Sequence, residues 1–206
     1  MSFQWIIDNA ETISMERKKV VASTTSRNGV VRSVSRGPQP WRFEVKLPDG
    51  PRWSDIRGYI SQVELLDRVT AANIQINNSK QVSWFSKYQG DSVNYTGFVA
   101  TIVNNSATIT LTTSPTTSSG YKFRAGDFIQ LGSSGKVYTV AADVAFNSNS
   151  VTLHRPVLES SASGVALRVA DNCVWSVVCT QFPTWTIFAR DQVSWSGPFV
   201  FSEVIT

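Results

Sequence analysis

The sequence contains little of what enzymes use for catalysis. Its 206 residues include one histidine and two cysteines, and only 17% of them are charged. One histidine cannot supply a zinc site, and the cysteines lack metal-ligand spacing. There is no glycine-rich phosphate loop, no nucleophile elbow and no spaced carboxylate pair that stands out as an acid/base couple. These absences predict a protein that is not an enzyme and that uses no metal and no cofactor.

The single histidine, His154, ends a Val-Thr-Leu-His stretch. A Ser-His-Asp site is arithmetically possible, but one imidazole would have to carry every proton transfer of the reaction. We therefore interpret His154 as a structural residue at the end of a strand. The sequence predicts no catalytic, cofactor-binding or metal-binding residue.

The two cysteines, Cys173 and Cys179, lie in the run CVWSVVC. In a strand they share one face, because residues six apart have the same parity. They would then lie about 20 Å apart at roughly 3.3 Å per residue, which is too far for a disulfide. The run predicts a buried central strand with two small apolar cysteines.

Long apolar runs are also missing. No segment approaches the roughly 20 apolar residues that span a bilayer, and the opening MSFQWIIDNAE has neither the basic start nor the apolar core of a signal peptide. We expect a protein with no membrane partner, made in the cytoplasm, that stays soluble or is built into a particle there. The net charge of +4, with a sequence pI near 9.2, is mild, and such a charge bears on solubility rather than on fold.

One stretch, residues 54–69, has the pattern of an amphipathic helix. We expect Ser54 to cap its first turn, and the face opposite the apolar one is polar. An apolar helix face must pack on something, and only strands are available. The sequence therefore predicts a β-rich core covered by a single helix. The apolar positions recur at i, i+3, i+4 and i+7: Ile56, Tyr59, Ile60, Val63 and Leu66 or Leu65.

Strands are predicted on both sides of this helix. Residues 41–47 alternate most clearly between apolar and polar side chains, and residues 73–77 form a short strand before a turn at 77–80. The alternation of Phe3, Trp5 and Ile7 predicts a first strand. Together these segments indicate a sheet.

The stretch between the predicted first strand and the strand at 41–47 is predicted to contain a hairpin. Residues 11–22 are predicted as strand, loop, strand. In Arg27-Asn28-Gly29, the Asn-Gly pair indicates a two-residue turn with positive φ angles. The same stretch is basic, which suits either nucleic-acid binding or a solvated strand face. We favour the solvated face, because no aromatic side chains are interleaved with the charges: Arg17, Lys18, Lys19, Arg27, Arg32 and Arg36.

The composition changes from about residue 86 to 163, where Ser, Thr, Gly and Asn are abundant and turn signals recur every few residues. Short strands at this spacing predict a small barrel. We expect them at residues 98–103, 108–113, 128–131, 136–144, 150–154 and 166–169.

The earlier composition then returns in the strand at 173–180, the strand at 185–189 and an aromatic-rich end. This order predicts a small domain inserted into a larger one. The larger domain is discontinuous and comprises residues 1–85 and 166–206. The inserted barrel comprises residues 86–165.

This arrangement resembles the distal tail protein of long-tailed, siphovirus-type bacteriophages, in the form where a ring domain carries an inserted OB-like barrel. The resemblance rests on the strand at 41–47, the helix at 54–69, the run AGDFIQL…VYTV…VTLHRP and the closing WTIFARDQVSWSGPFVFSEV. It covers most of the chain in architecture, although its motifs are short. Residues 11–36 match nothing in that family.

The resemblance implies a mainly β fold: a tail-tube-like β-sandwich or split barrel with one packed helix, plus an inserted small OB-like β-barrel. It implies a structural protein of the virion that forms a homo-oligomeric ring, hexameric in the family, at the phage tail tip. DNA passes through such a ring, which joins the tail-tube protein to the baseplate hub or tip protein. The barrel would project outward, where a host-surface saccharide is a candidate partner.

Two functions from different classes follow. In a ring component, we expect the aromatic residues Trp195, Phe199 and Phe201 to be buried against neighbouring subunits. Alternatively, the barrel is a module that binds carbohydrate or single-stranded nucleic acid. An exposed row of its aromatic residues beside Lys122 and Arg124 would favour that alternative. The candidates are Tyr88, Tyr95, Phe98, Tyr121, Phe123, Phe128, Tyr138 and Phe146.

Overall fold

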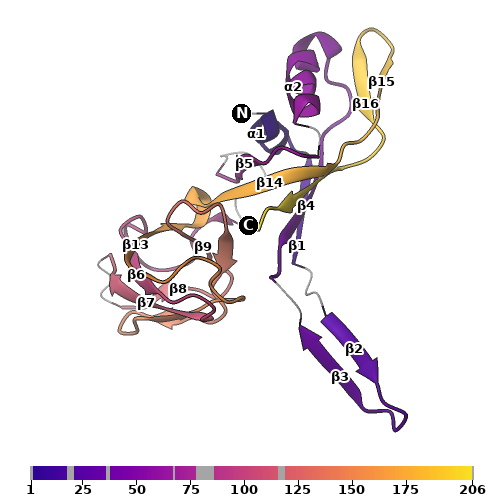
Figure 1. Ribbon diagram of the computed structural model, residues 1–206. Helices are drawn as coiled ribbons and strands as arrows, with labels where there is room; N and C mark the ends of the chain where they lie inside the picture. The colour runs from indigo at the N-terminus through magenta and orange to yellow at the C-terminus, as the bar shows by residue number, and fades with distance from the viewer. Residues whose placement is uncertain are drawn as a thin grey trace.

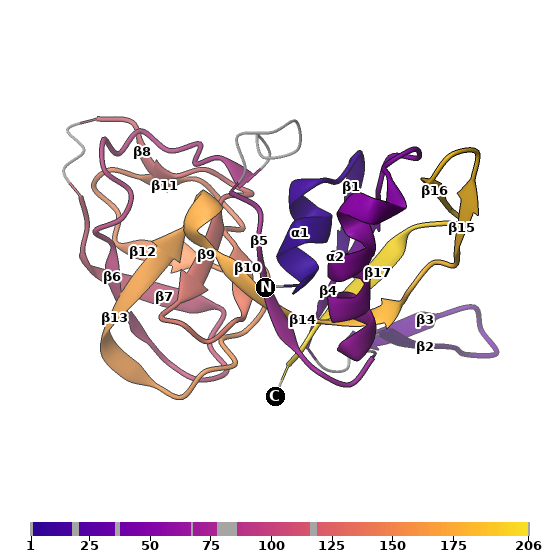
Figure 2. The same ribbon diagram turned by 90° about the horizontal axis from the view of Figure 1, so that it is seen from above.

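The computed structural model describes residues 2–17, 21–35, 38–66, 68–77, 86–115 and 119–205. Within these residues the fold is mainly β, as the sequence predicts. Figure 1 shows a sheet with its helices, a curled barrel beside it and a long hairpin that points away from both. Figure 2 gives the same arrangement from above, with the barrel and the helix-covered sheet side by side.

A five-stranded antiparallel sheet forms the first part, in the order β1-β4-β17-β14-β5. Two helices, α1 (Ser2–Asp8) and α2 (Trp53–Leu65), contribute buried residues to the core on one of its faces (Figure 2). Strand β4 alternates as predicted, with Trp41, Phe43 and Val45 buried. The strands are β1 (Thr12–Arg17), β4 (Trp41–Lys46), β5 (Ala72–Gln75), β14 (Val174–Gln181) and β17 (Phe199–Glu203).

A six-stranded antiparallel sheet forms the barrel, in the order β10-β9-β13-β6-β7-β12. Its two edges meet at a bridge between Val140 and Leu153, where the Ala141 N–H donates to the Thr152 carbonyl at 2.8 Å. Closing a sheet in this way removes its open edges. The strands are β6 (Val99–Ile102), β7 (Thr108–Thr113), β9 (Phe128–Leu131), β10 (Val137–Thr139), β12 (Ser150–Thr152) and β13 (Ala162–Val169).

Two of the predicted barrel strands differ in extent, and one strand was not predicted. The strand predicted at 136–144 is two strands, β10 and β11 (Val144–Ala145), because the chain bends between them. Strand β13 begins at Ala162 and not at residue 166. A further strand, β8 (Tyr121–Phe123), pairs with β11 and is too short to give a periodic signal. A 3-10 turn, η2 (Ala170–Asn172), leads from the barrel back to β14.

The predicted first strand is wrong, because residues 2–8 form helix α1. Phe3, Ile6 and Ile7 are all buried, and their spacing of i, i+3 and i+4 is that of one helix face. Trp5 lies half-buried and stacks on Tyr59 of α2 at a centroid distance of 4.8 Å. The sheet is therefore covered by two helices, whereas the sequence indicated one.

Helix α2 is shorter than predicted, and its capping differs. It begins at Trp53, and Ser54 is inside it instead of capping it. The Trp53 N–H donates to the Asp191 carbonyl at 2.7 Å, and the Ser54 N–H donates to the Asp191 carboxylate at 3.3 Å. A distant loop residue thus takes the role that the sequence assigned to Ser54.

The helix ends at Leu65, and Arg68 follows with a left-handed φ of 57°. That conformation cannot continue a right-handed helix. The predicted end at residue 69 is therefore wrong, and Asp67 lies outside the described residues. The buried face consists of Ile56, Ile60 and Val63, as predicted, and Tyr59 at its margin remains 42% exposed.

The two strands predicted within residues 11–22 are confirmed as β1 and β2 (Val21–Thr25), and the loop expected between them has its residues 18–20 outside the described ranges. Strand β2 pairs with β3 (Val31–Ser35) in a two-stranded ribbon, which we call the arm (residues 21–35). At its tip only Gly29 has a positive φ, of 75°, and the Ser26 N–H donates to the Val30 carbonyl at 2.9 Å. The turn therefore has three residues, in place of the two-residue turn expected from Asn-Gly.

A second ribbon, β15 (Trp185–Phe188) with β16 (Gln192–Trp195), extends beside α2 (Figure 1). Its loop contains Arg190 and Asp191, both with positive φ. Asp191 is also the residue that caps α2. The ribbon and the helix therefore hold each other in place.

Apart from Val200, the buried apolar side chains of the described residues fall into two clusters, one beneath the helices and one inside the barrel. Phe128 and Val137 belong to barrel strands, yet their side chains lie in the first cluster. The predicted division at 165/166 falls inside β13, which lies wholly in the barrel sheet. The division into a discontinuous domain and an inserted one stays a prediction. The turn expected at 77–80 has its residues 78–80 outside the described ranges.

Candidate assembly surfaces

A buried ion pair joins the barrel to the five-stranded sheet. Arg155 follows β12, Glu203 ends β17, and their side chains are 1% and 0% exposed. The guanidinium donates two hydrogen bonds to the carboxylate, at 2.8 and 2.7 Å. The same carboxylate accepts the Trp41 N–H at 3.1 Å and the Val137 N–H at 3.2 Å. Four donors thus stabilise a charge that burial alone would make very costly.

Further contacts surround this pair, and we call the whole region the junction (Trp41, Phe128, Val137, Arg155 and Glu203). Arg155 also donates to the carbonyls of Gln39 at 2.8 Å and Val137 at 3.1 Å. The Trp41 indole donates to the Val137 carbonyl at 2.7 Å, and its ring lies 5.7 Å from that of Phe128. Polar and aromatic contacts therefore fix the barrel on the sheet.

His154 lies beside the junction and has a structural role there. Its Nδ1 accepts the Thr139 N–H at 2.9 Å, and its ring contacts Trp41 at 5.6 Å. Burial, with Arg155 and then Arg17 nearby, lowers the pKa of His154 to about 3. The imidazole is thus neutral near pH 7, where a general base would need to exchange protons. We retain the interpretation of His154 as structural.

The basic stretch is divided between two places. Arg17 lies over the Trp41 ring at 5.0 Å and donates to Thr139 Oγ1 at 2.6 Å. Burial lowers the pKa of Arg17, and Arg155 lowers it further. Arg27 and Arg32 are exposed on the arm. Lys18, Lys19 and Arg36 lie outside the described residues. The described basic residues of the stretch therefore do not form one patch.

The aromatic residues of the barrel mostly face inward. Phe98, Phe123 and Tyr138 are each 0% exposed, and Phe128 is in the junction. Tyr88 and Tyr95 stack on each other against the barrel core. Of the eight predicted candidates, only Phe146 is among the exposed large apolar side chains. The exposed row that would favour a stacking site is not found in the described part of the barrel.

The two basic residues expected beside that row are already engaged. Lys122 is 5% exposed and donates to the Ser148 carbonyl at 2.8 Å and to Asn149 Oδ1 at 2.7 Å, and burial lowers its pKa. Arg124 lies over the Tyr121 ring at 3.7 Å and pairs with Asp143 at 3.1 Å. These contacts hold the barrel together.

The aromatic residues at the C-terminal end are not a subunit interface. Trp195, Phe199 and Phe201 are 8%, 1% and 0% exposed within a single chain. Phe201 packs on Phe3 of α1 at 5.1 Å, and Phe199 lies between Trp195 and Phe182. Their prediction as interface residues is wrong, because their own chain already buries them.

Both cysteines are buried, as predicted, at 0% and 3% exposure, and neither forms a disulfide. Cys179 lies in β14, whereas Cys173 immediately precedes that strand, which differs from the prediction of one strand containing both. Burial raises the pKa of Cys173 well above its usual value. The Cys173 thiol is therefore a poor nucleophile.

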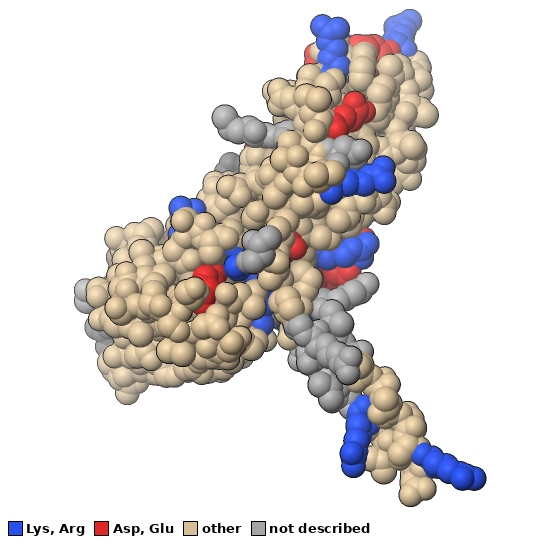
Figure 3. Space-filling model, in the orientation of Figure 1, with Lys and Arg blue, Asp and Glu red and all other residues tan. Residues whose placement is uncertain are grey.

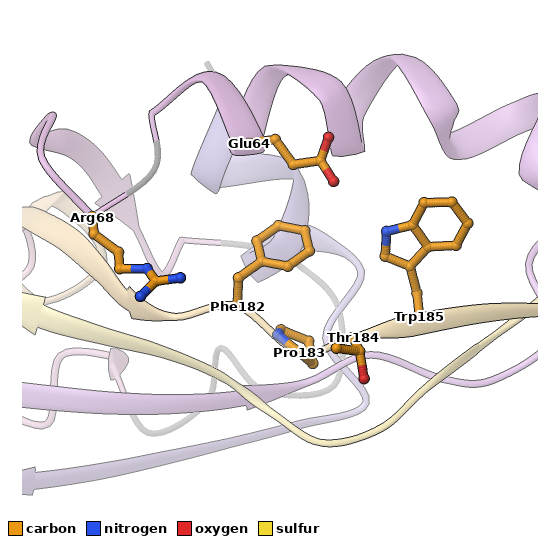
Figure 4. A pocket seen from close by; sticks show the side chains of 6 residues that line it. All are labelled: Glu64, Arg68, Phe182, Pro183, Thr184 and Trp185. Carbon is orange, nitrogen blue, oxygen red and sulfur yellow. The ribbon is translucent and has the colours of Figure 1, made fainter.

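One open groove lies between the end of α2 and the chain that leads into β15 (Figure 4). Its volume is about 390 Å³, and we call it the groove (Glu64, Arg68, Phe182, Pro183, Thr184 and Trp185). Phe182 packs edge-on against Phe199 at 5.0 Å, and Trp185 stacks on Trp53 at 4.4 Å. The apolar walls are thus supported from behind.

Unlike the walls of the groove, the side chains of the arm have no packing support from other residues that the structure describes. Every side chain from residue 22 to residue 32 is exposed. Val30 and Val31 at its tip are 55% and 64% exposed. In the space-filling view the far end of the arm carries basic side chains (Figure 3), and the described arm residues contain Arg27 and Arg32 but no acid.

The two edges of the five-stranded sheet also differ. At β5, Gln4 of α1 donates to the Gln75 carbonyl and accepts the Gln75 N–H, each at 2.8 Å. The side-chain amide thus pairs with the edge as another strand would. At the other edge, β1 pairs only with β4 among the strands of the described ranges. One edge is therefore blocked and the other is open.

In the described part of the chain, no group of three or more His, Cys, Asp or Glu side chains is placed to hold a metal ion. No helix there is long and apolar enough to cross a membrane. Comparison with models of known protein families gives no match, and comparison with curated proteins gives none either.

Proposed function

We propose that this chain is a structural ring component of a bacteriophage tail tip. In this proposal several copies, six by analogy with the family it resembles, surround a channel for DNA. The ring joins the tail-tube protein to the baseplate hub or tip protein. The proposal rests on the resemblance stated above and on one feature of the structure.

That feature is the arm. A two-stranded ribbon is at best marginally stable by itself in water, and every side chain from residue 22 to residue 32 is exposed. A surface of this kind suits a protein that works within an assembly. The junction complements it, because a barrel attached through a buried ion pair keeps one orientation in every copy.

The alternative function, a barrel that binds carbohydrate or single-stranded nucleic acid, has less support. It required an exposed aromatic row, and the described aromatic residues of the barrel are mostly buried. A host saccharide as partner of the barrel stays a prediction that follows only from the resemblance.

The test is the location of the chain in phage particles. Purified virions are analysed by mass spectrometry, and antibodies against the chain are located on them by electron microscopy. We expect the chain in intact particles and the label at the distal end of a long tail. Absence from intact particles would reject the proposal and direct attention to glycan and oligonucleotide binding by the whole chain.

A further inference from the structure

The exposed large apolar side chains of the described residues gather mainly in two places. One is the arm tip, with Val30 and Val31. The other surrounds α2 and the β15–β16 ribbon, where the groove lies, and includes Leu65, Ile187 and Phe188. The remaining ones on the barrel, such as Val93 and Val103, are far apart in sequence, and neither of these two lines the groove.

These two surfaces lie at opposite ends of the molecule. In Figure 1 the arm extends down and away from the sheet, whereas α2 and the β15–β16 ribbon lie at the top. The arm tip therefore cannot reach the groove of its own chain. If the two surfaces meet, they meet between copies, and such a contact is heterologous, the type that closes rings.

The two surfaces are complementary in shape and polarity. The arm tip is a narrow projection with two neighbouring valines, and the groove is a hollow of about 390 Å³ with apolar walls from Phe182, Pro183 and Trp185. A volume of that order accommodates several side-chain groups. Burial of the valines there would remove apolar area from water at both ends at once.

Charge adds a second argument. Arg27 and Arg32 flank the valines, and neither has an ion-pair partner among the residues that the structure describes. Glu64 lies over the groove (Figure 4), and its carboxylate has no such partner there either. Arg68 lies at the other end of the groove from Trp185 (Figure 4).

We infer that the arm tip of one copy binds in the groove of the next copy, with Val30 and Val31 against Trp185 and Pro183 and an arm guanidinium beside Glu64. This inference rests on the proposed ring function and identifies the contact that links its subunits. Because each copy carries one arm and one groove, the contact can repeat from copy to copy.

The test is a disulfide between copies. The full-length double variant Val31→Cys/Thr184→Cys is oxidised under native conditions and separated on a denaturing, non-reducing gel. We expect a ladder of covalent oligomers. A mixture of the two single variants should stop at dimers, because each copy then offers one reactive partner. The native thiols should not interfere, because both are buried.

A matched control uses Val103→Cys/Thr184→Cys, in which the arm cysteine is replaced by one at a barrel position of similar exposure, 54% against 64%. We expect no ladder from it. A charge test follows by sedimentation of the full chain. Arg32→Glu and Glu64→Lys should each weaken self-association about tenfold, and the double variant should regain most of it.

The absence of a Val31-Thr184 ladder at high protein concentration would overturn the inference, and so would an equal ladder from the Val103 control. These results are separable from the proposed function. A chain that labels the tail tip but gives no ladder keeps its ring role and loses only this contact. A ladder from a chain that is absent from virions keeps the contact and removes the phage role.

Discussion

The barrel and the arm both leave the five-stranded sheet, and the molecule holds them in different ways. The barrel is anchored by Arg155 and Glu203, which are 1% and 0% exposed, and by the aromatic contacts of the junction. The arm is connected through the ends of β1 and β4, and its described side chains from 22 to 32 are all exposed. One extension is fixed within its own chain, whereas the other offers its surface outward.

The two extensions therefore differ in how much they contribute to the stability of the single chain. Burying a charged pair requires each partner to be satisfied, and the junction satisfies Glu203 with four donors. An exposed ribbon contributes little to the folded chain, so its sequence is free to serve a contact with another molecule. Substitutions in the two regions should therefore affect different measurements.

The largest expected effect is at the junction. Glu203→Gln leaves the Arg155 guanidinium buried without its counter-charge, and we expect a loss of about 3–5 kcal/mol in the free energy of unfolding. Urea unfolding followed by tryptophan fluorescence measures it. The matched control is Glu16→Gln, which removes the half-exposed pair with Arg42 and should cost about 0–1 kcal/mol. Equal losses in the two variants would contradict a junction held by this pair.

The pH dependence of stability tests the environment of His154. Its folded-state pKa of about 3 lies below the ordinary value of 6.5, so below pH 6.5 the unfolded chain binds a proton that the folded chain does not. Stability is then complete above pH 6.5 and falls as the pH drops toward 3. At pH 5 the loss from this residue is about 2 kcal/mol.

His154→Asn keeps an acceptor for the Thr139 N–H and removes the titrating ring. We expect the variant to lose about 2 kcal/mol less than the native chain between pH 7 and pH 5. Urea unfolding at both pH values measures the difference, in which contributions from other groups cancel. Parallel pH profiles would mean that His154 is solvated like an ordinary imidazole.

The two edges of the five-stranded sheet also differ in how they are held, and the expected changes in stability are smaller. Gln4→Ala removes two hydrogen bonds to Gln75, each of 2.8 Å, and we expect a loss of about 1–2 kcal/mol. The variant should also aggregate sooner, because it exposes the edge of β5. Ser14→Ala on the open β1 edge is the control and should stay within about 0.5 kcal/mol. Thermal unfolding with light scattering records both effects.

The smallest effect on folding is expected in the arm. Val31→Ser should change the free energy of unfolding of the monomer by less than about 0.5 kcal/mol, because Val31 is 64% exposed. Val177→Ser, at 0% exposure in β14, should cost about 2 kcal/mol or more. The order should reverse in self-association, where Val31→Ser weakens binding between folded copies. A large folding defect in Val31→Ser would show that the arm is supported by its own chain.

Local patterns predicted the elements in which buried and exposed side chains recur at a regular period. Strand β4 and the apolar face of α2 were predicted, because burial on one side imposes periods of 2 and 3.6 on the sequence. Helix α1 was missed, because its seven residues fit both periods; Phe3, Ile6 and Ile7 carried the helical spacing, and Phe3, Trp5 and Ile7 the alternating one. In so short an element, the sequence alone does not distinguish the helical period from the strand period.

The candidate surfaces were less predictable than the elements. The hairpin at Asn28-Gly29 was expected, but its turn has one positive φ angle and not two. The C-terminal aromatic residues were assigned to an interface, although aromatic side chains of the same chain, among them Phe3 and Phe182, pack against them. The groove could not be anticipated, because it brings together Glu64 and Trp185 from separate parts of the chain.

The sequence by itself determined that the protein is mainly β, that a basic hairpin follows its first strand and that its cysteines are buried. These properties depend on neighbours a few residues away, which composition and periodicity record. Only the tertiary structure decided that Arg155 contacts Glu203 and that the aromatic residues at the C-terminal end belong to the core. It also decided that the arm and the groove lie at opposite ends of the molecule. Those facts depend on contacts between residues tens of positions apart, and chain folding, not local spacing, brings them together.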